Sequence, residues 1–318
     1  MKSLVTGGLG FLGSHLVDVL LEKGDEVTIV DNLSTNAVPQ EGYTGRCRVL
    51  DLSVEDYECD ETFDVVYHLA SVVGPAGVLT HAGRIGYSIM VETDKLISMC
   101  SKQNAKFVLI STSEVYGRDG VFAENVDKIV PGIVSVRTEY GAGKLLAEIA
   151  TINRARVIPL KYHIIRPFNI SGSRQKPDGG FVLPRFVVQA VKGEDITVFG
   201  KGTQLRAFTH ARDISEATVG LAHSDLASDI WNIGNIRNLM TINELAEAVK
   251  KACGSSSKIV HLDGKEIYGP LYEEAFDKLP NITKIETHLG WKPRFTLDEI
   301  IQDVVAYYTK RAPMTAGS

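Results

Sequence analysis

Three glycines near the start of the chain constrain its fold more than any other feature. Gly7, Gly10 and Gly13 lie between a predicted strand, residues 3–6, and a segment over residues 15–23 with apolar residues at helical spacing. Such glycines permit a tight turn, close approach of the backbone to a pyrophosphate, and close packing of helix on strand. The helix N-terminus then supplies amide donors. The spacing therefore predicts a dinucleotide-binding turn, with a purely structural turn as the alternative.

An acidic residue closes the second predicted strand, residues 26–31. A carboxylate at Asp31 accepts hydrogen bonds from a ribose diol and repels a 2′-phosphate, so NAD is favoured over NADP. If the turn were only structural, Asp31 would be a solvated strand end. The residues of this region that we expect to contact NAD are Gly7, Gly10, Phe11, Leu12, Gly13, Asp31 and Asn32.

Short apolar runs alternate with amphipathic stretches in the first half of the chain. Further strands are predicted at residues 64–70, 106–111 and 162–166, and helices at 85–103 and 139–154. Strands separated by helices of this length form βαβ units and a parallel sheet. We therefore expect an α/β protein with a Rossmann-type doubly wound parallel sheet and a smaller C-terminal α/β substrate domain.

The composition of the sequence changes after Arg166, where Gly, Ser, Pro and charged residues become frequent. We expect residues 1–166 to form the NAD-binding domain, with part of residues 209–230 returning to it. Residues 167–318 would mainly form the second domain. Helices are predicted there at residues 181–192, 242–253 and 297–308, the second of them opened by a capping box.

The composition excludes several classes of protein. The 318 residues include 34 Lys and Arg against 39 Asp and Glu, a formal charge of −5, whereas a nucleic-acid-binding chain needs a surplus of cations. The four cysteines lie far apart, and the eight histidines include no metal-binding pair at helical spacing, so we expect neither disulfides nor a metal. With no leader and no apolar run near the ~18 residues of a membrane span, we expect a cytoplasmic protein without nucleic-acid or membrane partners.

A tyrosine and a lysine stand four residues apart in one predicted helix. Tyr140 and Lys144 would share a helix face, where a fixed cation favours the phenolate form of the tyrosine. That phenolate can take the proton of an alcohol that loses hydride. The polar segment 111–117 follows a predicted strand, and ligands bind at the carboxyl ends of parallel strands. We therefore expect Thr112, Glu114, Tyr140 and Lys144 to converge on one substrate.

Together these segments resemble the extended short-chain dehydrogenases/reductases of the nucleotide-sugar epimerase, dehydratase and decarboxylase type. The resemblance runs from Ser3 to about Tyr308. It rests on residues 6–13, 31–34, 51–52, 68–70, 111–117, 140 with 144, 166–169, 198–208, 232–234 and 289–293. It implies an NAD-dependent enzyme, expected to be a homodimer, that oxidises C4 of a nucleoside-diphosphate sugar, with a UDP-sugar as the first choice.

The resemblance also implies roles for individual residues. Tyr140 would take the proton of the sugar C4 hydroxyl, Lys144 would hold the nicotinamide ribose, and Thr112 would bond near O4. The further residues that would line the NAD site are Asp51 and Leu52, beside the adenine, and Leu69 and Ala70. The residues that would bind the substrate are Ser113, Asn169, Val182, Arg185, Arg206 and Lys278.

Glu114 bears on the fate of the 4-keto intermediate. With a carboxylate just after the Thr-Ser pair, this segment resembles the corresponding segment of sugar-nucleotide 4,6-dehydratases and UDP-glucuronate decarboxylases. Once C4 is a ketone, the C5 proton is acidic and a β-carboxylate can leave, so Glu114 would act as general base or acid. The arginine at position 137, three residues before Tyr140, is similar to the pattern found in the decarboxylase branch. Two departures from that branch stand against it.

The first departure is Lys278, which stands where the decarboxylase branch generally has an arginine, and lysine offers no bidentate fork. The second is the segment 171–173, Ser-Gly-Ser, which replaces the usual Tyr-Gly-Pro. Decarboxylation or dehydration is the first expectation, and UDP-sugar 4-epimerisation is the alternative. A non-catalytic NAD(H)-binding regulator is the alternative from another class of protein.

Overall fold

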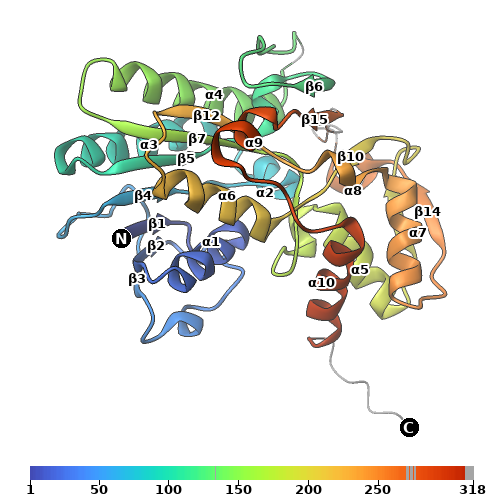
Figure 1. The fold of residues 1–318 in the computed structure, drawn as a ribbon. Coiled ribbons are helices and arrows are strands. Elements are labelled where there is room, and N and C mark those ends of the chain that lie inside the picture. The colour runs from blue at the N-terminus through green and yellow to red at the C-terminus, as the bar shows by residue number, and fades with distance from the viewer. Residues whose placement is uncertain (133, 270–271, 273–274, 276, 312–318) are drawn as a thin grey trace.

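Seven parallel strands form the central sheet of the computed structural model, which describes residues 1–132, 134–269, 272, 275 and 277–311 (Figure 1). Their order is β12-β7-β5-β4-β1-β2-β3. The bounds are β1 (Lys2–Thr6), β2 (Glu26–Asp31), β3 (Arg48–Asp51), β4 (Val65–His68), β5 (Lys106–Ile110), β7 (Lys161–Pro167) and β12 (Asp229–Ile233). Strand order reverses beside β1, the place where such sheets bind ligands. The predicted doubly wound sheet is confirmed.

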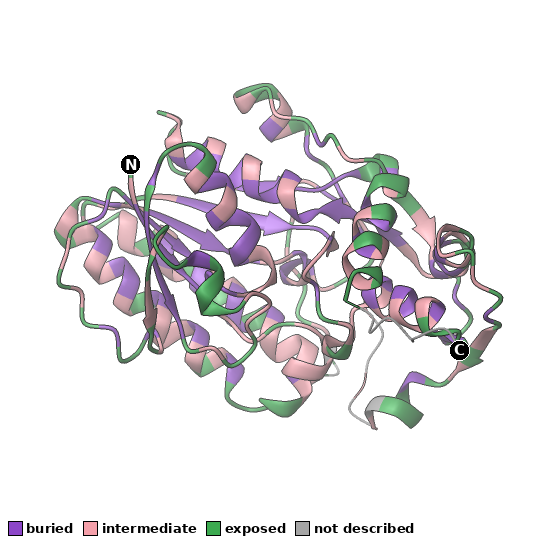
Figure 2. Ribbon diagram, turned by 90° about the horizontal axis from the view of Figure 1, so that it is seen from below, coloured by how far each residue is buried: buried purple, intermediate pink, exposed green. Residues whose placement is uncertain are grey.

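Helices cover both faces of this sheet. On one face, α1 (Phe11–Glu22) and α6 (Ala211–His223) bury their apolar sides in one cluster with β1 and β2. On the other face, α3 (Ile85–Gln103) and α4 (Val136–Ala155) pack in a second cluster, preceded by the short α2 (Pro75–Thr80). Figure 2 shows the strands between these layers as almost entirely buried. None of the described helices is long and apolar enough to span a bilayer.

Helix α4 begins earlier than the predicted residue 139, because a capping box opens it at Ser135. The Ser135 hydroxyl accepts a hydrogen bond from the Thr138 amide, and the Thr138 hydroxyl accepts one from the Ser135 amide. Such reciprocal bonds satisfy two of the free amides at a helix start. The added turn is followed directly by Tyr140 and Lys144. These two residues therefore lie in the well-anchored first half of the helix.

The elements after β7 form a smaller layer with its own apolar cluster, seen beside the sheet in Figure 1. Its helices are α5 (Val182–Lys192), α7 (Ile242–Ala252), α8 (Gly264–Tyr268) and α10 (Leu297–Thr309), whereas α9 (Thr283–Leu289) packs on β12 in the cluster of the large sheet. Its short strands are β8 (Ile170–Ser171), β9 (Ile196–Phe199), β10 (Leu205–Ala207), β11 (Thr209–His210), β13 (Leu239–Thr241), β14 (Ile259–Leu262) and β15 (Lys278–Pro280). The segment with α6 and β12 joins the large sheet. The division into two domains at residue 166 stays a prediction.

Two segments far apart in sequence meet beside α4. Strand β6 (Gly120–Phe122) follows the short 3₁₀ turn Ser113–Tyr116, and β15 pairs with β6 in parallel. The register places Lys278 opposite Gly120. The pairing therefore carries a lysine from the C-terminal part of the chain to the segment that holds Glu114.

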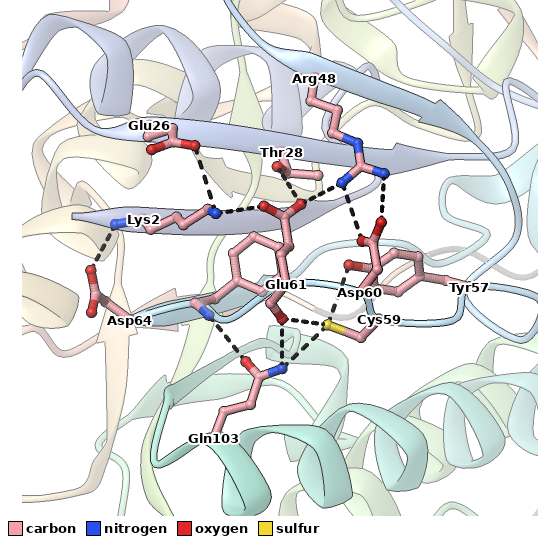
Figure 3. A network of polar contacts seen from close by, with 11 residues as sticks. Lys2, Glu26, Thr28, Arg48, Tyr57, Cys59, Asp60, Glu61, Asp64 and Gln103 are labelled. Atoms are coloured by element: carbon pink, nitrogen blue, oxygen red, sulfur yellow. Dashed lines mark hydrogen bonds and ion pairs between the residues drawn. The ribbon is translucent and has the colours of Figure 1, made fainter.

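A network of ion pairs closes the opposite end of the sheet, where β1, β2 and β3 begin (Figure 3). The Glu61 carboxylate contacts Lys2 Nζ at 2.7 Å and Arg48 Nη1 at 2.9 Å, and accepts a hydrogen bond from Thr28 Oγ1 at 3.2 Å. Arg48 also forms a bidentate pair with Asp60. Surface pairs of this kind contribute little individually, but together they hold the segment before β4 against three strands.

A buried ion pair joins α4 to the sheet. Arg166 on β7 donates to both carboxylate oxygens of Glu148 on α4, at 2.9 and 2.5 Å, and both side chains are almost fully buried. Arg166 also donates to the Tyr116 hydroxyl, which donates to Asn232 on β12. Ser111 donates to the same Glu148 carboxylate at 2.5 Å. The network fixes α4 against β7, β12 and the segment that follows β5.

Glu148→Gln is expected to destabilise the fold strongly, because it leaves the Arg166 guanidinium buried without its counter-charge. The expected loss in the free energy of unfolding is about 3–5 kcal/mol. Urea denaturation followed by the fluorescence of the buried Trp231 measures it. The control is Asp94→Asn, which breaks an exposed pair with Arg154 and should cost less than about 1 kcal/mol. Equal losses in the two variants would contradict the anchoring role.

Candidate active site

The glycine turn after β1 leaves no space for side chains. Gly7 has φ 70°, and its amide donates to the Val30 carbonyl at 2.8 Å. A Cβ on Gly13 would lie 2.0 Å from the Gly7 oxygen, and a Cβ on Gly7 would lie 2.8 Å from the Ala70 amide nitrogen. Helix α1 begins at Phe11, directly after Gly10, so its first amides face this turn. The turn is a backbone cradle of the kind that binds a pyrophosphate.

Asp31 organises this cradle from the end of β2. Its carboxylate accepts the amide of Leu9 on one oxygen and that of Leu33 on the other, both at 2.9 Å. Each oxygen keeps a further lone pair for a ribose hydroxyl. The next strand ends alongside, since Asp51 pairs in register with Asp31, and the exposed Leu52 follows it. These residues fit an NAD molecule.

The opposite wall of the cradle comes from the end of β4. The Leu69 amide donates to the Thr6 carbonyl at 3.1 Å, and the Ala70 amide donates to the Thr6 hydroxyl at 3.3 Å. Leu69 and Ala70 therefore lie at the carboxyl end of the sheet beside Gly7, as expected for residues that line a cofactor cleft.

The segment after β5 meets the first turns of α4. Thr112 caps the 3₁₀ turn by accepting the Glu114 amide at 3.2 Å, and its hydroxyl is hydrogen-bonded to Tyr140. Ser113, the first residue of the turn, is buried. The backbones approach closely at Gly141, where a Cβ would lie 3.1 Å from the Glu114 carbonyl oxygen. The structure thus brings Thr112, Glu114 and Tyr140 together.

The effect of Lys144 on the pKa of Tyr140 stays a prediction. Burial raises the pKa of the Tyr140 phenol, Thr112 and Arg137 act against the rise, and Glu114 adds to it. Lys144 instead donates to the Ile110 carbonyl at 3.0 Å and is almost fully buried. Burial lowers the pKa of Lys144 to about 8, while Glu92 and Glu148 act against this fall.

Glu114 lies between two cations. One of its oxygens is 3.1 Å from Arg137 Nη1 and 3.1 Å from Lys278 Nζ. Burial would raise the pKa of this carboxyl, but Lys278 and Arg137 outweigh it, so the pKa is lowered. Glu114 is therefore an ionised carboxylate at neutral pH. Lys278 is buried, and burial lowers its pKa, with Glu114 acting against the fall.

The other predicted substrate residues lie on elements around this cluster. Arg206 on β10 pairs with Asp277 at 2.9 Å, next to Lys278 in the chain. Asn169 adopts φ 37° and donates to the Ala207 carbonyl at 3.4 Å. On α5, Val182 is the first residue, and Arg185 turns to β9, donating to the Thr197 carbonyl at 3.0 Å. Their roles in substrate binding stay predictions.

Sequence reasoning missed several residues that shape the site. The Glu139 carboxylate accepts the amides of Gly83 and Gly86 and so links α4 to the start of α3. A Cβ on Gly143 would lie 2.9 Å from the Gly86 Cα, so Gly143 permits the close approach of these two helices. The signal was present, because glycine in a helix interior costs about 1 kcal/mol relative to alanine and needs a packing reason.

The glycine cradle, the carboxylate at the end of β2 and the Thr-Tyr-Lys group define a dinucleotide-dependent enzyme of the Rossmann type. The chain belongs to the NAD dependent epimerase/dehydratase family, whose model matches residues 3–234. This confirms the predicted family, the enzyme class and NAD as cofactor.

Individual relatives cover almost the whole chain. A UDP-N-acetyl-alpha-D-glucosaminuronate decarboxylase of Bacillus cytotoxicus is 32% identical over 96% of this chain and 97% of its own. UDP-glucuronic acid decarboxylase 1 of Danio rerio is 31% identical over 100% of this chain and 75% of its own. Among solved structures, the UDP-glucuronic acid 4-epimerase of Bacillus cereus with NAD is 26% identical, with a TM-score of 0.82 over 98% of this chain and 100% of its own.

Gly13→Ala is expected to weaken NADH binding, because the new methyl group must displace the Gly7 carbonyl or move α1. We expect a loss of roughly tenfold or more, which corresponds to about 1.4 kcal/mol, in a fluorescence titration with NADH. Gly132→Ala is the matched control, since a Cβ at Gly132 meets nothing within 4 Å. Unchanged affinity in Gly13→Ala would contradict the proposed cradle.

Proposed function

We propose that this protein converts a UDP-linked uronic acid through a 4-keto intermediate and decarboxylates it. The observation that carries the proposal is the placement of Glu114 between Arg137 and Lys278. With the Arg206–Asp277 pair, the described residues of this cluster hold three cations and two carboxylates. Charge-assisted hydrogen bonds from these cations suit the carboxylate of a uronic acid, whereas a neutral hexose needs no such charge.

The first step oxidises the C4 alcohol of the sugar. Gly7, Gly10, Gly13 and Asp31 would hold NAD, which when bound would supply the acceptor for the C4 hydride and return it at the end of the cycle. Tyr140 takes the hydroxyl proton, and the bond to Thr112 orients the phenol. Lys144 is the fixed cation of this site. Because burial raises the pKa of Tyr140, a bound positive charge is needed to favour its phenolate.

The second step breaks the C5–C6 bond. Once C4 is a ketone, the C6 carboxylate is β to a carbonyl, so its departure as CO₂ leaves the electron pair of the C5–C6 bond as an enolate over C4 and C5. A proton then adds at C5 to restore the ketone. Arg137 and Lys278 would hold the carboxylate beside Glu114 and orient the breaking bond. The relatives named as decarboxylases of UDP-linked uronic acids support this reaction.

Dehydration fits the geometry less well. Loss of a hydroxyl as water needs a proton donor, and Glu114 is held ionised by Lys278 and Arg137. The second candidate is 4-epimerisation of the same uronic acid, favoured by the lysine at position 278, which offers no bidentate grip on a carboxylate. The 4-epimerase of Bacillus cereus also shares the fold over its full length. Both candidates use the same first step.

We also propose that the enzyme works as a cytoplasmic homodimer. Helices α3 and α4 lie side by side and expose apolar side chains, with Tyr87 74%, Leu146 50% and Ile149 45% exposed. An exposed apolar face of this kind marks an interface. Sedimentation velocity distinguishes the dimer from a monomer.

Incubation with UDP-glucuronate is expected to yield a UDP-pentose and one CO₂ for each sugar consumed. Mass spectrometry and NMR of the products measure this. A product of unchanged mass with inverted C4 would indicate epimerisation in place of decarboxylation. A product lighter by one water would indicate dehydration. Tyr140→Phe should abolish turnover. If it turns over UDP-glucuronate at the wild-type rate, the proposed mechanism is wrong.

Lys278→Gln is expected to raise KM for UDP-glucuronate by roughly 10- to 100-fold, the equivalent of a charge-assisted hydrogen bond of about 1.5–3 kcal/mol. Lys278→Arg should keep the affinity. UDP-glucose serves as the neutral comparison ligand, whose affinity the charge change should leave nearly unaffected in a competition assay. An equal loss for both ligands would place Lys278 at the shared nucleotide instead of the sugar carboxylate.

A further inference from the structure

The segment at residues 171–173, where the decarboxylase branch usually has Tyr-Gly-Pro, contacts two helices that are far apart in the sequence. The Ser173 carbonyl accepts a hydrogen bond from His15 Nε2 on α1 at 3.0 Å. The Ser173 amide donates to the Asp303 carboxylate on α10 at 2.6 Å. A proline at position 173 has no amide hydrogen and could not form the second bond. The departure from the usual pattern therefore makes the contact with Asp303 possible.

The next two residues of the chain contact the same two helices. Arg174 forms an ion pair with Asp18 on α1, with 2.7 Å between Nη2 and the carboxylate. The Gln175 carbonyl accepts a hydrogen bond from the Tyr308 hydroxyl on α10 at 2.6 Å. Helix α1, which begins at the glycine cradle, and the C-terminal helix α10 therefore both hold residues 173–175.

Asp303 joins this segment to a third element. The carboxylate oxygen that accepts the Ser173 amide also accepts a hydrogen bond from His210 Nε2 at 3.1 Å. Because His210 Nδ1 accepts the Arg212 amide at 3.0 Å, the ring proton is on Nε2, and His210 is a donor to Asp303. Burial would raise the pKa of Asp303, but the bonds from His210 and Ser173 outweigh it and lower the pKa to about 2. Asp303 is thus an ionised acceptor for two separate segments.

The backbone of the segment depends on contacts of this kind. Asn169, Gly172 and Arg174 have φ of 37°, 153° and 71°, in a region that residues other than glycine rarely adopt. Such a backbone persists only where its surroundings determine it. Without the bond to Asp303, the segment can adopt other conformations, and Asn169, four residues before Ser173, moves with it.

We propose that Asp303 is a positioning residue, which holds residues 169–175 against α1 through Ser173 and so places Asn169 for the UDP-linked sugar. The proposal rests on the proposed function and on the predicted contact of Asn169 with that substrate. A ligand that binds one arrangement of a segment loses affinity in proportion to the fraction of molecules that leave this arrangement. Weakening the contact with Asp303 therefore lowers the affinity for the substrate.

The first test compares two substitutions at one position, with UDP as the ligand because all candidate substrates contain it. Ser173→Pro deletes the amide donor and restores the usual Gly-Pro, whereas Ser173→Ala keeps the amide and removes only the hydroxyl, which also bonds to Asp303. In calorimetric titrations of the full-length protein, Ser173→Pro should raise the Kd for UDP roughly three- to tenfold, the range for one hydrogen bond. Ser173→Ala should raise it less, and equal Kd values in the two variants overturn the proposal.

The Kd for NADH separates positioning from a general loss of structure. It should stay at the wild-type value in Ser173→Pro, because the apolar side of α1 holds this helix against the sheet. An equal weakening of UDP and NADH binding overturns the proposal, and so does a lower free energy of unfolding with unchanged UDP binding.

Asp303 supplies a second pair of variants, in case Ser173→Pro does not fold. Asp303→Ala removes the acceptor and should raise the Kd for UDP, whereas Asp303→Asn keeps an acceptor oxygen and should restore most of the affinity. Asp298→Ala, which changes an exposed acid in the first turn of α10, is the control and should bind UDP as the wild type does. Wild-type affinity in Asp303→Ala overturns the proposal.

Hydrogen–deuterium exchange measures the hold on the segment without any substrate. The remaining amides of residues 169–175 should exchange faster in Ser173→Pro and Asp303→Ala than in the wild type, and at the wild-type rate in Asp298→Ala. Unaltered exchange in the first two variants overturns the proposal. Failure of the wild type to bind UDP would refute the proposed function, while the exchange rates would still decide whether Asp303 holds the segment.

Discussion

The buried pair of Arg166 and Glu148 is the interaction on which the site depends most. Glu148 lies one turn after Lys144 and two turns after Tyr140 on α4, so its anchor on β7 fixes the position and the rotation of the turns that carry these two residues. The same carboxylate receives Ser111, the residue that begins the segment carrying Thr112 and Glu114. One acid therefore aligns the two segments whose side chains must meet. Burying such a pair is costly, and the hydrogen bonds that surround it offset the cost.

Charge in this molecule is arranged locally, and the overall charge of −5 says little about the site. Several buried and half-buried cations face an acid, as in the pairs of Arg166 with Glu148 and of Arg206 with Asp277. Glu114 departs from this pattern because two cations share it. This gathering of two cations around one acid is the basis of the proposal that an anionic sugar binds there.

Local signals were sufficient to predict most of the frame. The glycine spacing, the strand closed by Asp31 and the amphipathic stretch at residues 85–103 all correspond to observed elements, because short-range sterics and periodicity determine them. The Ser135 capping box was overlooked, which misplaced the start of α4. Pairings between distant segments could not be predicted from the sequence. Neither the contact of Lys278 with Glu114 nor the burial that raises the pKa of Tyr140 has a local signature.

The pairing of β6 with β15 determines when one contact of the site can form during translation. A growing chain that has reached Arg166 already contains the cradle, Glu114 and Arg137, and N-terminal parts generally fold first. Lys278 reaches this segment only when β15 has been synthesised and docked beside β6. Until then Glu114 lacks one of its two partners. The contact between Lys278 and Glu114 can thus form only after residues 278–280 have left the exit tunnel, whereas the glycine cradle consists of residues made much earlier.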